Sequence, residues 1–368
     1  MPTSSQTRAL ALVAVVALAL AACSSGGSDA SSSSSRATTT ARSTDGSSTT
    51  TSPTGSTGLA GSAGCGTDTK LEIGSQQEIT VKSGGLERKS DVWLPKGYRS
   101  DLPAPLIIDF HAFAPRSIEE GFSGLTIKRD DGSIPADTAG TVVLTPLGIA
   151  AGTTPAWNVT HYAKWADDEG FAIDLLDQVE KTTCIDTHRV YLTGFAIGAQ
   201  MAAVVACDHA DRITAFAAVS GIFDPAGCKP SRAVPVLTFN GTADPMIPYK
   251  GGIGPNVPML NLDAATSAGE TDMIARLKPV PDVIDTWVQR DGCGATPDTF
   301  KAAPDATLSE WSGCKDSAVV KSYLFQGGGH AWPQSPGTKA LAGLLGPTPT
   351  SLPATDLILA FFSEHKLP

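Results

Sequence analysis

Short runs of apolar residues alternate with helical segments through most of this 368-residue chain, and this alternation constrains its fold more than any other feature. Strands covered on both faces read as unbroken apolar runs, whereas strands with one solvated face alternate between apolar and polar residues. The pattern predicts an α/β fold, a doubly wound and mostly parallel sheet with helices on both faces. Alternating edge strands are expected at 78–83 and 88–94, unbroken strands at 106–110, 141–145, 190–193, 214–220, 236–240 and 319–325, and helices at 164–183, 197–209, 283–290 and 355–365.

The N-terminus has the pattern of an export signal. Arg8 precedes an apolar run at 9–23 that is too short to span a bilayer comfortably and ends in small residues. Its last residues, LAAC ending at Cys23, are similar to the bacterial lipobox, in which the cysteine becomes lipidated. We therefore predict a lipoprotein signal peptide at 1–22 and a chain that is lipid-anchored at the extracellular face of the bacterial cell membrane or secreted. An ordinary cleaved signal is the alternative.

A polar segment separates this signal from the body of the chain. Residues 24–62 contain 23 Ser or Thr and no aromatic residue, so they cannot bury enough apolar surface to offset the entropy of ordering. We expect 23–62 to form a lipidated tether and 63–368 to form one large α/β domain. The net charge of −10 includes no basic run, which argues against nucleic acid as a partner and against a membrane contact other than the lipid. The domain is expected to be a monomer.

Six cysteines follow Cys23, and an even count in an exported chain predicts three disulfides. Cys293 and Cys314 lie in DGC and SGC turns that flank a short polar excursion, so we predict that they pair with each other. A metal site is the competing interpretation, but no Cys-x-x-Cys motif or ligand-spaced Cys/His pair is present, and no metal or cofactor is expected. The pairing is left open for the remaining four, Cys65, Cys184, Cys207 and Cys228.

The stretch VYLTGFAIGAQMAA, residues 190–203, has the strand, glycine turn and small-residue helix of a nucleophile elbow. In many hydrolases this turn is G-x-S-x-G, but here Ala196 lies where that motif has serine. Asp244 and His330 follow later predicted strands, and the order elbow, Asp, His is that of an α/β-hydrolase triad. In such sheets, reactive groups lie at the carboxyl ends of the strands.

At this point the chain resembles the secreted polyhydroxybutyrate depolymerase-like and feruloyl esterase-like esterases, which include actinobacterial lipoproteins. The resemblance covers nearly all of 63–368 and rests on GGLERKSDVWLPKGY, LPAPLIIDFHA, CIDTHRVYLTG, GAQM, DRITAFAAVSG, GTADPMIPY, DGC and GGGHAWP. It implies that Asp244 orients His330, that His330 is the general base, and that the nucleophile belongs at position 196. It also implies an oxyanion hole made by the backbone N–H of Ile197 and one from the loop after His111, that is Ala112 or Phe113.

The chain departs from this family pattern at more than one position around the predicted pocket. Ala196 replaces the serine, Ala112 replaces the glycine after His111, and Asn240 replaces a histidine before Gly-Thr-Ala-Asp. Several changes around one pocket favour natural drift over a single engineered substitution. The predicted function is therefore a pseudoenzyme that binds an ester, glycan or partner, with an esterase that uses another nucleophile or activated water as the alternative.

Other residues near the predicted loops are candidates for ligand contact. His111, Trp157 and Trp332 are candidate substrate-pocket residues for a small ester, an aromatic-acid ester or a polymer, with ordinary packing as the alternative for the tryptophans. Residues 245–281 are expected to form a long surface insertion over the pocket. Four histidines are assigned to surface or capping roles in preference to ligand roles, namely His161, His188, His209 and His365. Asp167 and Asp168 lie at a predicted helix start, where they are expected to favour the helix dipole, with an acid/base pair as the alternative.

Overall fold

A computed structural model describes residues 60–113, 121–149, 155–260 and 277–368. The predictions for the signal peptide, for lipidation of Cys23 and for most of the tether lie outside the described residues. Within the described ranges, no helix has the length and apolar character needed to cross a membrane.

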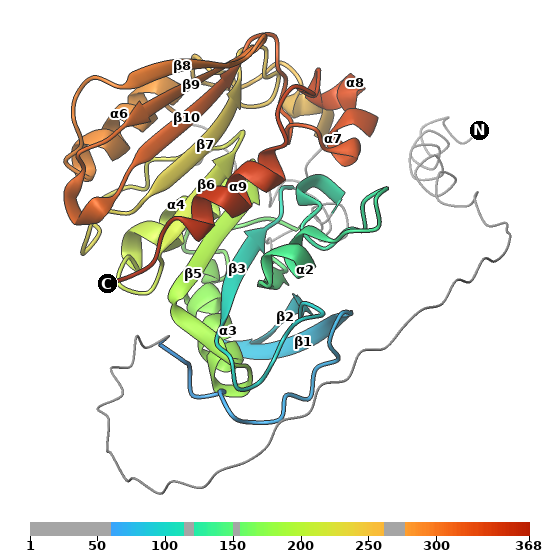
Figure 1. Cartoon of the computed structure of the whole chain (residues 1–368). Helices are drawn as coiled ribbons and strands as arrows, with labels where there is room; N and C mark the ends of the chain where they lie inside the picture. Colours follow the sequence, from blue (N-terminus) through green and yellow to red (C-terminus); the bar gives the residue numbers. More distant parts are fainter. Residues whose placement is uncertain (1–59, 114–120, 150–154, 261–276) are drawn as a thin grey trace, which may run out of the picture. The chain divides into compact units, whose positions relative to one another are not determined.

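The core of the fold is a ten-stranded sheet in the order β1-β2-β4-β3-β5-β6-β7-β10-β9-β8 (Figure 1). The six central strands from β4 to β10 are parallel, whereas β1 and β2 at one edge and β9 and β8 at the other are antiparallel to their neighbours. This arrangement confirms the predicted mostly parallel sheet. The strands are β1 (Gln76–Ser83), β2 (Leu86–Trp93), β3 (Ala104–Phe110), β4 (Val142–Pro146), β5 (Ile185–Phe195), β6 (Ala215–Val219), β7 (Val236–Gly241), β8 (Asp298–Ala303), β9 (Ala306–Trp311) and β10 (Val320–Phe325).

Helices cover both faces of the sheet, and each face has its own hydrophobic core. One core joins β3 and β5 to α3 (Asp168–Thr182), α4 (Ile197–Asp208) and α6 (Val280–Arg290). The other joins the opposite face to α2 (Pro135–Ala139) and α9 (Ala354–Ser363), which lie in front of the sheet in Figure 1. Alternate residues of a strand point to opposite faces, so Ile108 belongs to the first core and Ile107 to the second. The short helices are η2 (Val257–Leu260), η3 (Lys315–Ser317), α7 (Pro336–Ala340) and α8 (Ala342–Leu345).

Three disulfides join all six cysteines of the domain. Cys293 pairs with Cys314, as predicted. The pairings that the sequence left open are Cys65 with Cys184, across 119 residues, and Cys207 with Cys228. By loop-closure entropy each contributes on the order of 3 kcal/mol or more. Cys65–Cys184 joins the segment before β1 to the start of β5, and so ties the edge of the sheet to its centre.

The region between Cys293 and Cys314 differs from its prediction as a polar excursion. It forms the antiparallel hairpin β8–β9, which extends the sheet beyond β10. Five of the six residues of β8 are exposed, because this strand has a neighbour on one edge only and little cover on either face. Such a strand carries no apolar periodicity for sequence reasoning to detect.

A buried ion pair ties β2 to the start of α3. Arg88 Nη2 lies 2.5 Å from Asp168 Oδ1, and the side chains are only 1% and 0% exposed. The guanidinium also lies over the ring of Phe171 and donates to the carbonyl of Leu147, while the N–H of Asn158 donates to Asp168 Oδ2. Burial raises the pKa of Asp168 to about 6, and Arg88 acts in the opposite direction. The prediction that Asp168 only favours the helix dipole is therefore incomplete, since its main contact is Arg88.

We expect Arg88→Met to destabilise the protein by about 3–5 kcal/mol at pH 7, because it leaves the Asp168 carboxylate buried without its partner. The matched control is Arg99→Met, which removes an ion pair with Asp101 whose side chains are 63% and 64% exposed, and should leave the stability almost unchanged. Urea unfolding of both variants measures the difference. Equal losses in the two variants would contradict a structural role for the buried pair.

Candidate active site

The turn between β5 and α4 has the backbone geometry of a nucleophile elbow. Ala196 adopts φ 53° and ψ −118°, a conformation that residues other than glycine rarely occupy. Gly194 and Gly198 flank Ala196, and both must be glycine because backbone atoms of other residues lie too close to leave room for a side chain. A Cβ at Gly198 would lie 1.9 Å from the carbonyl oxygen of Phe110 at the end of β3, and one at Gly194 would lie 2.6 Å from the carbonyl carbon of Gly198. The elbow therefore retains its shape although its central residue has only a methyl group.

Asp244 and His330 lie together at the carboxyl ends of β7 and β10. His330 Nδ1 lies 2.8 Å from Asp244 Oδ2, and both side chains are almost completely buried. The other carboxylate oxygen, Oδ1, accepts hydrogen bonds from the N–H groups of Met246 and Ile247, at 2.7 and 2.8 Å. Asp244 thus orients the imidazole and also caps the segment that follows it.

The loop that carries His330 is held by a residue that sequence reasoning did not identify. Ser220, directly after β6, donates from Oγ to the carbonyl of Ala331 and accepts from its N–H, at 3.1 and 3.2 Å. The ring of His330 also packs against Phe195, with centroids 4.7 Å apart. No sequence pattern indicates this role for Ser220, because a serine at the end of a strand is unremarkable until its partner loop is known. Ser220 is a positioning residue.

A narrow cavity of about 40 Å³ opens beside the elbow and His330. Phe113, from the predicted oxyanion loop, and Ile197, the first residue of α4, both contribute to its wall. The N–H of Ile197 is among those at a helix start that have no acceptor within the helix, which suits it to bind an oxyanion. Ala112, the other predicted oxyanion residue, does not line this cavity. The lining residues are Phe113, Ala196, Ile197, Gln200, Met246, Ile247, Ile253, Val257, Leu260, Leu277 and His330.

The insertion predicted at 245–281 forms much of this wall. Six of the lining residues, from Met246 to Leu277, belong to it, and residues 261–276 lie outside the described chain. Its apolar side chains make the cavity hydrophobic except at Gln200 and His330.

The prediction that Trp157, Trp332 and His111 line the substrate pocket is wrong for the described cavity. Both tryptophans are fully buried and use their indole N–H groups internally, Trp157 to the carbonyl of His111 and Trp332 to Thr355 Oγ1. His111 is also fully buried, and its Nε2 accepts the N–H of Gly148 at 2.9 Å. These three residues stabilise the loops from the protein interior, because each of their side-chain polar atoms makes a hydrogen bond within the protein.

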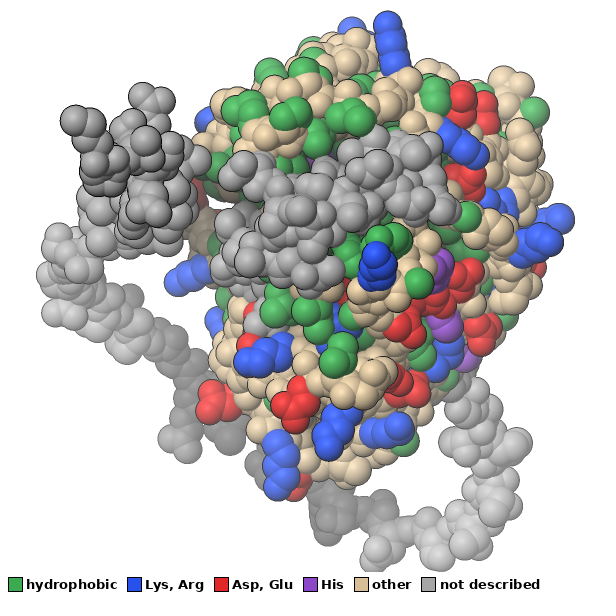
Figure 2. Space-filling model, turned by 180° about the vertical axis from the view of Figure 1, so that it is seen from behind, with side chains coloured by type: hydrophobic (Ala, Val, Ile, Leu, Met, Phe, Trp, Pro, Cys, Tyr) green, Lys and Arg blue, Asp and Glu red, His purple; other side chains and the backbone are tan. Residues whose placement is uncertain are grey.

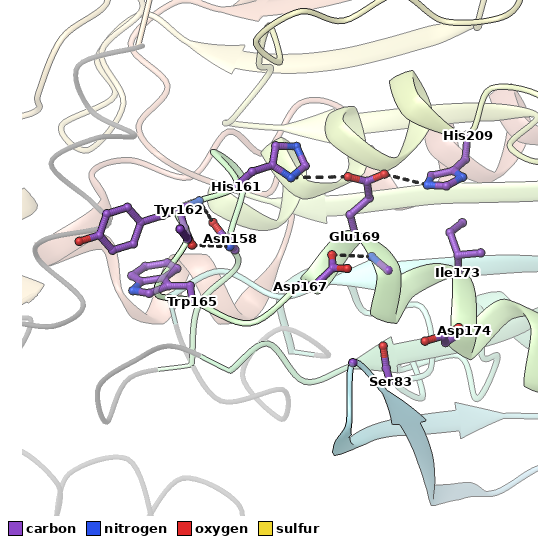
Figure 3. Close-up of a pocket in the computed structure, with 13 residues that line it drawn as sticks. Ser83, Asn158, His161, Tyr162, Trp165, Asp167, Glu169, Ile173, Asp174 and His209 are labelled. Carbon is purple, nitrogen blue, oxygen red and sulfur yellow. Dashed lines mark hydrogen bonds and ion pairs between the residues drawn. The ribbon is translucent and has the colours of Figure 1, made fainter.

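A second, open cleft of about 520 Å³ lies between the 158–165 loop, the start of α3 and the end of α4 (Figure 3). Glu169 lies at its centre, 2.9 Å from His209 Nε2 and 3.6 Å from His161 Nδ1. The hydrogen bond to His209 lowers the pKa of Glu169 and raises that of His209. Histidine and carboxylate side chains also lie next to one another on the face seen in Figure 2, which views the molecule from behind.

Two residues of this cleft, His161 and Glu169, form the donor set of a metal site together with Asp208, which lies outside its lining. One ligand atom each from His161, Glu169 and Asp208 lie within 4.8 Å of one another, and nitrogen and carboxylate ligands suit a divalent transition metal. The His209–Glu169 hydrogen bond accounts for the placement of the central carboxylate without an ion. The sequence assigned His161 and His209 to surface or capping roles, and the structure adds that both pair with Glu169.

The parallel sheet, the elbow at its centre and the Asp–His pair at neighbouring strand ends define an α/β-hydrolase. Within this class, the chain is similar in sequence to feruloyl esterases. It is 29% identical over 254 residues to feruloyl esterase B of Piromyces equi, an alignment that covers 66% of this chain and 42% of the relative. It is 26% identical over 285 residues to feruloyl esterase D of Neurospora crassa, covering 74% and 82%.

The chain thus spans less than half the length of the first of these relatives. No family model matches the sequence. Among solved structures, acetyl xylan esterase from Aspergillus awamori is similar with a TM-score of 0.49 and 14% identity, covering 73% of this chain and 99% of that one.

We expect Ala196→Gly to change the free energy of unfolding by less than about 0.5 kcal/mol, because relief of the left-handed strain offsets the lost methyl and the added chain entropy. The matched control is Ala203→Gly, in the interior of α4, where no strain is relieved. That change should cost about 1.5–2 kcal/mol from helix propensity and the lost buried methyl. Urea denaturation compares the two, and equal losses would show that position 196 carries no strain.

Proposed function

We propose that this chain is a cell-surface member of its esterase family that binds an ester without efficient turnover. The observation that carries the proposal is the methyl group of Ala196 in the nucleophile's position, within an elbow that is otherwise intact. The Asp244–His330 pair beside it favours retention of the site's architecture, and so of a binding role, over general decay.

The missing hydroxyl has a large effect on rate. In a serine hydrolase, loss of the nucleophile lowers kcat by on the order of 10⁶, because serine and histidine act as a unit. From a typical kcat of about 10 s⁻¹, roughly one turnover per day would remain. Such a rate supports binding as the role of the site.

An active hydrolase is the second candidate, favoured by the 2.8 Å contact between His330 and Asp244. In that mechanism His330 would take a proton from a water molecule through Nε2, the water oxygen would attack the ester carbonyl, and Asp244 would stabilise the imidazolium. The N–H of Ile197 would bind the oxyanion, and the alcohol would leave with the proton returned by His330.

The cavity favours an ester of a small acid. About 40 Å³ beside Ala196 accepts a short acyl group, while a feruloyl group enters only if apolar side chains of the insertion turn aside. Ile253 is the wall residue with the greatest freedom to do so, since it is 56% exposed. The relatives carry the name feruloyl esterase and the cavity is small, so aromatic-acid esters and short-chain acyl esters are the two ligand classes that we propose.

Ala196→Ser tests the proposal, assayed in the full chain with methyl ferulate and 4-nitrophenyl acetate. The restored hydroxyl should raise kcat at least about 10⁴-fold above the parent chain, and His330→Ala in the Ala196→Ser background should abolish the gain. The control is the parent chain with His330→Ala, which should not differ from the parent.

Substantial turnover by the parent, lost in His330→Ala, would overturn the pseudoenzyme and establish the activated-water mechanism. An inactive Ala196→Ser variant would instead contradict the claim that the rest of the site is intact.

We further propose that Cys23 is lipidated and holds the domain at the outer face of the cell membrane. In a bacterial host fed labelled palmitate, the parent chain should incorporate the label and fractionate with membranes, since more than one acyl chain anchors a protein stably. Cys23→Ala should remove the label, and Cys65→Ala, in the first disulfide of the domain, should not. Label retained in Cys23→Ala would contradict the anchor.

A further inference from the structure

Three side chains at the open cleft come from three separate segments and bring metal-ligand atoms together. His161 belongs to the 158–165 loop, Glu169 to the first turn of α3, and Asp208 is the last residue of α4. One ligand atom from each lies within 4.8 Å of the others, and among the described residues this is the one such group of three. Sequence spacing could not indicate it, because the three segments meet only in the folded domain.

The loop that carries His161 is fixed by internal hydrogen bonds. The buried side chain of Asn158 accepts from the N–H of Tyr162 at 2.6 Å and donates to two backbone carbonyls of the loop, at 3.0 and 3.1 Å. Figure 3 shows the imidazoles of His161 and His209 on opposite sides of the Glu169 carboxylate. The His161 side chain is 54% exposed, so an ion can reach its ring from solvent.

The charges of this group are unfavourable without a cation. The Glu169 and Asp208 carboxylates lie close enough to repel each other, and Asp208 stands at the C-terminus of α4, where the helix dipole also disfavours a negative charge. The hydrogen bond from His209 explains where Glu169 lies. Asp208, in contrast, makes no hydrogen bond or ion pair within the described part of the chain. A cation between the two carboxylates would neutralise both.

We propose that His161, Glu169 and Asp208 bind a divalent transition-metal ion, with zinc the ion that their donor atoms suit best. Imidazole nitrogen and carboxylate oxygen are both ordinary zinc ligands, and three protein ligands leave one coordination position for water from the open cleft. The nitrogen ligand distinguishes the group from an acidic patch and disfavours Mg²⁺, which takes oxygen ligands.

The bound ion would join the 158–165 loop, the start of α3 and the end of α4. His209 would hold the Glu169 carboxylate from outside, as hydrogen-bond partners of metal ligands commonly do. The role of the ion is then stabilisation of this side of the domain. The inference does not depend on whether the cavity beside Ala196 binds an ester.

The experiment uses the full chain after treatment with EDTA, and measures binding of ZnCl₂ and of MgCl₂ by calorimetry and their effect on Tm. One Zn²⁺ should bind per chain, at least about tenfold more tightly than Mg²⁺. With free Zn²⁺ about 100-fold above its dissociation constant, Tm should rise by about 5 °C, because the ion binds the folded chain only.

Asp208→Asn and His161→Asn each remove one ligand and should weaken Zn²⁺ binding at least about tenfold, since loss of even an outer partner of a ligand costs about that much. Asparagine suits position 161 because it tolerates the left-handed backbone of His161, with φ 54°. The matched controls are Asp174→Asn, an exposed carboxylate of the same cleft, and His188→Asn, an imidazole of β5. Both controls should bind Zn²⁺ as the parent does.

Thermal unfolding in EDTA checks that the ligand variants remain folded. Both should unfold within about 2 °C of the parent, because the two side chains are exposed and neither packs in the core. At the Zn²⁺ concentration used for the parent, their rise in Tm should fall to about half or less. Either variant suffices if the other does not fold.

A parent chain that binds no Zn²⁺ and keeps its Tm would overturn the site. Zn²⁺ binding that is equally strong in Asp208→Asn and His161→Asn would assign the ion to other residues and overturn it as well. Mg²⁺ bound as tightly as Zn²⁺ would contradict a transition-metal site.

Discussion

The close approach between the start of α4 and the end of β3 is the constraint on which the rest of the site depends. Gly198 brings its Cα so near the carbonyl of Phe110 that no side chain fits between them. This contact places the first turn of α4 against the centre of the sheet and forces position 196 into its left-handed conformation. The N–H of Ile197, the methyl of Ala196 and the amide of Gln200 all take their positions from it.

The elbow has kept this costly geometry although the residue that usually justifies it is absent. Backbone strain of this kind costs on the order of 1–3 kcal/mol and persists when surrounding contacts determine it. Here the contacts belong to two hydrophobic cores that cover both faces of the sheet, and both include residues adjoining the elbow, Ile197 in one and Phe195 in the other. The framework therefore does not depend on a serine at position 196, because packing stabilises it.

The difference between residues that stabilise the framework and residues that face the cavity also explains the roles of the neighbouring side chains. His111, Trp157 and Trp332 have the residue types of a substrate pocket, but their polar atoms bond internally and their rings complete the core. Gln200 has the type of an ordinary helix residue, but its amide makes no hydrogen bond within the described part of the chain. Residue type alone cannot distinguish these cases, because the difference lies in where each side chain's hydrogen bonds are made.

Sequence reasoning predicted the central strands, the elbow and the order of Asp244 and His330, since buried parallel strands leave unbroken apolar runs and functional turns follow them. It also predicted Cys293–Cys314, whose partners are close in the chain. It did not predict the β8–β9 hairpin, whose exposed outer strand has no periodicity, or the pairing of Cys65 with Cys184 across 119 residues. The sequence by itself determined the class of fold and the identity of the residue at the nucleophile's position, because both are local patterns. Tertiary structure alone decided that Arg88 pairs with Asp168, that Ser220 holds the His330 loop, and which polar groups reach the cavity, because each depends on segments brought together only when the sheet is complete.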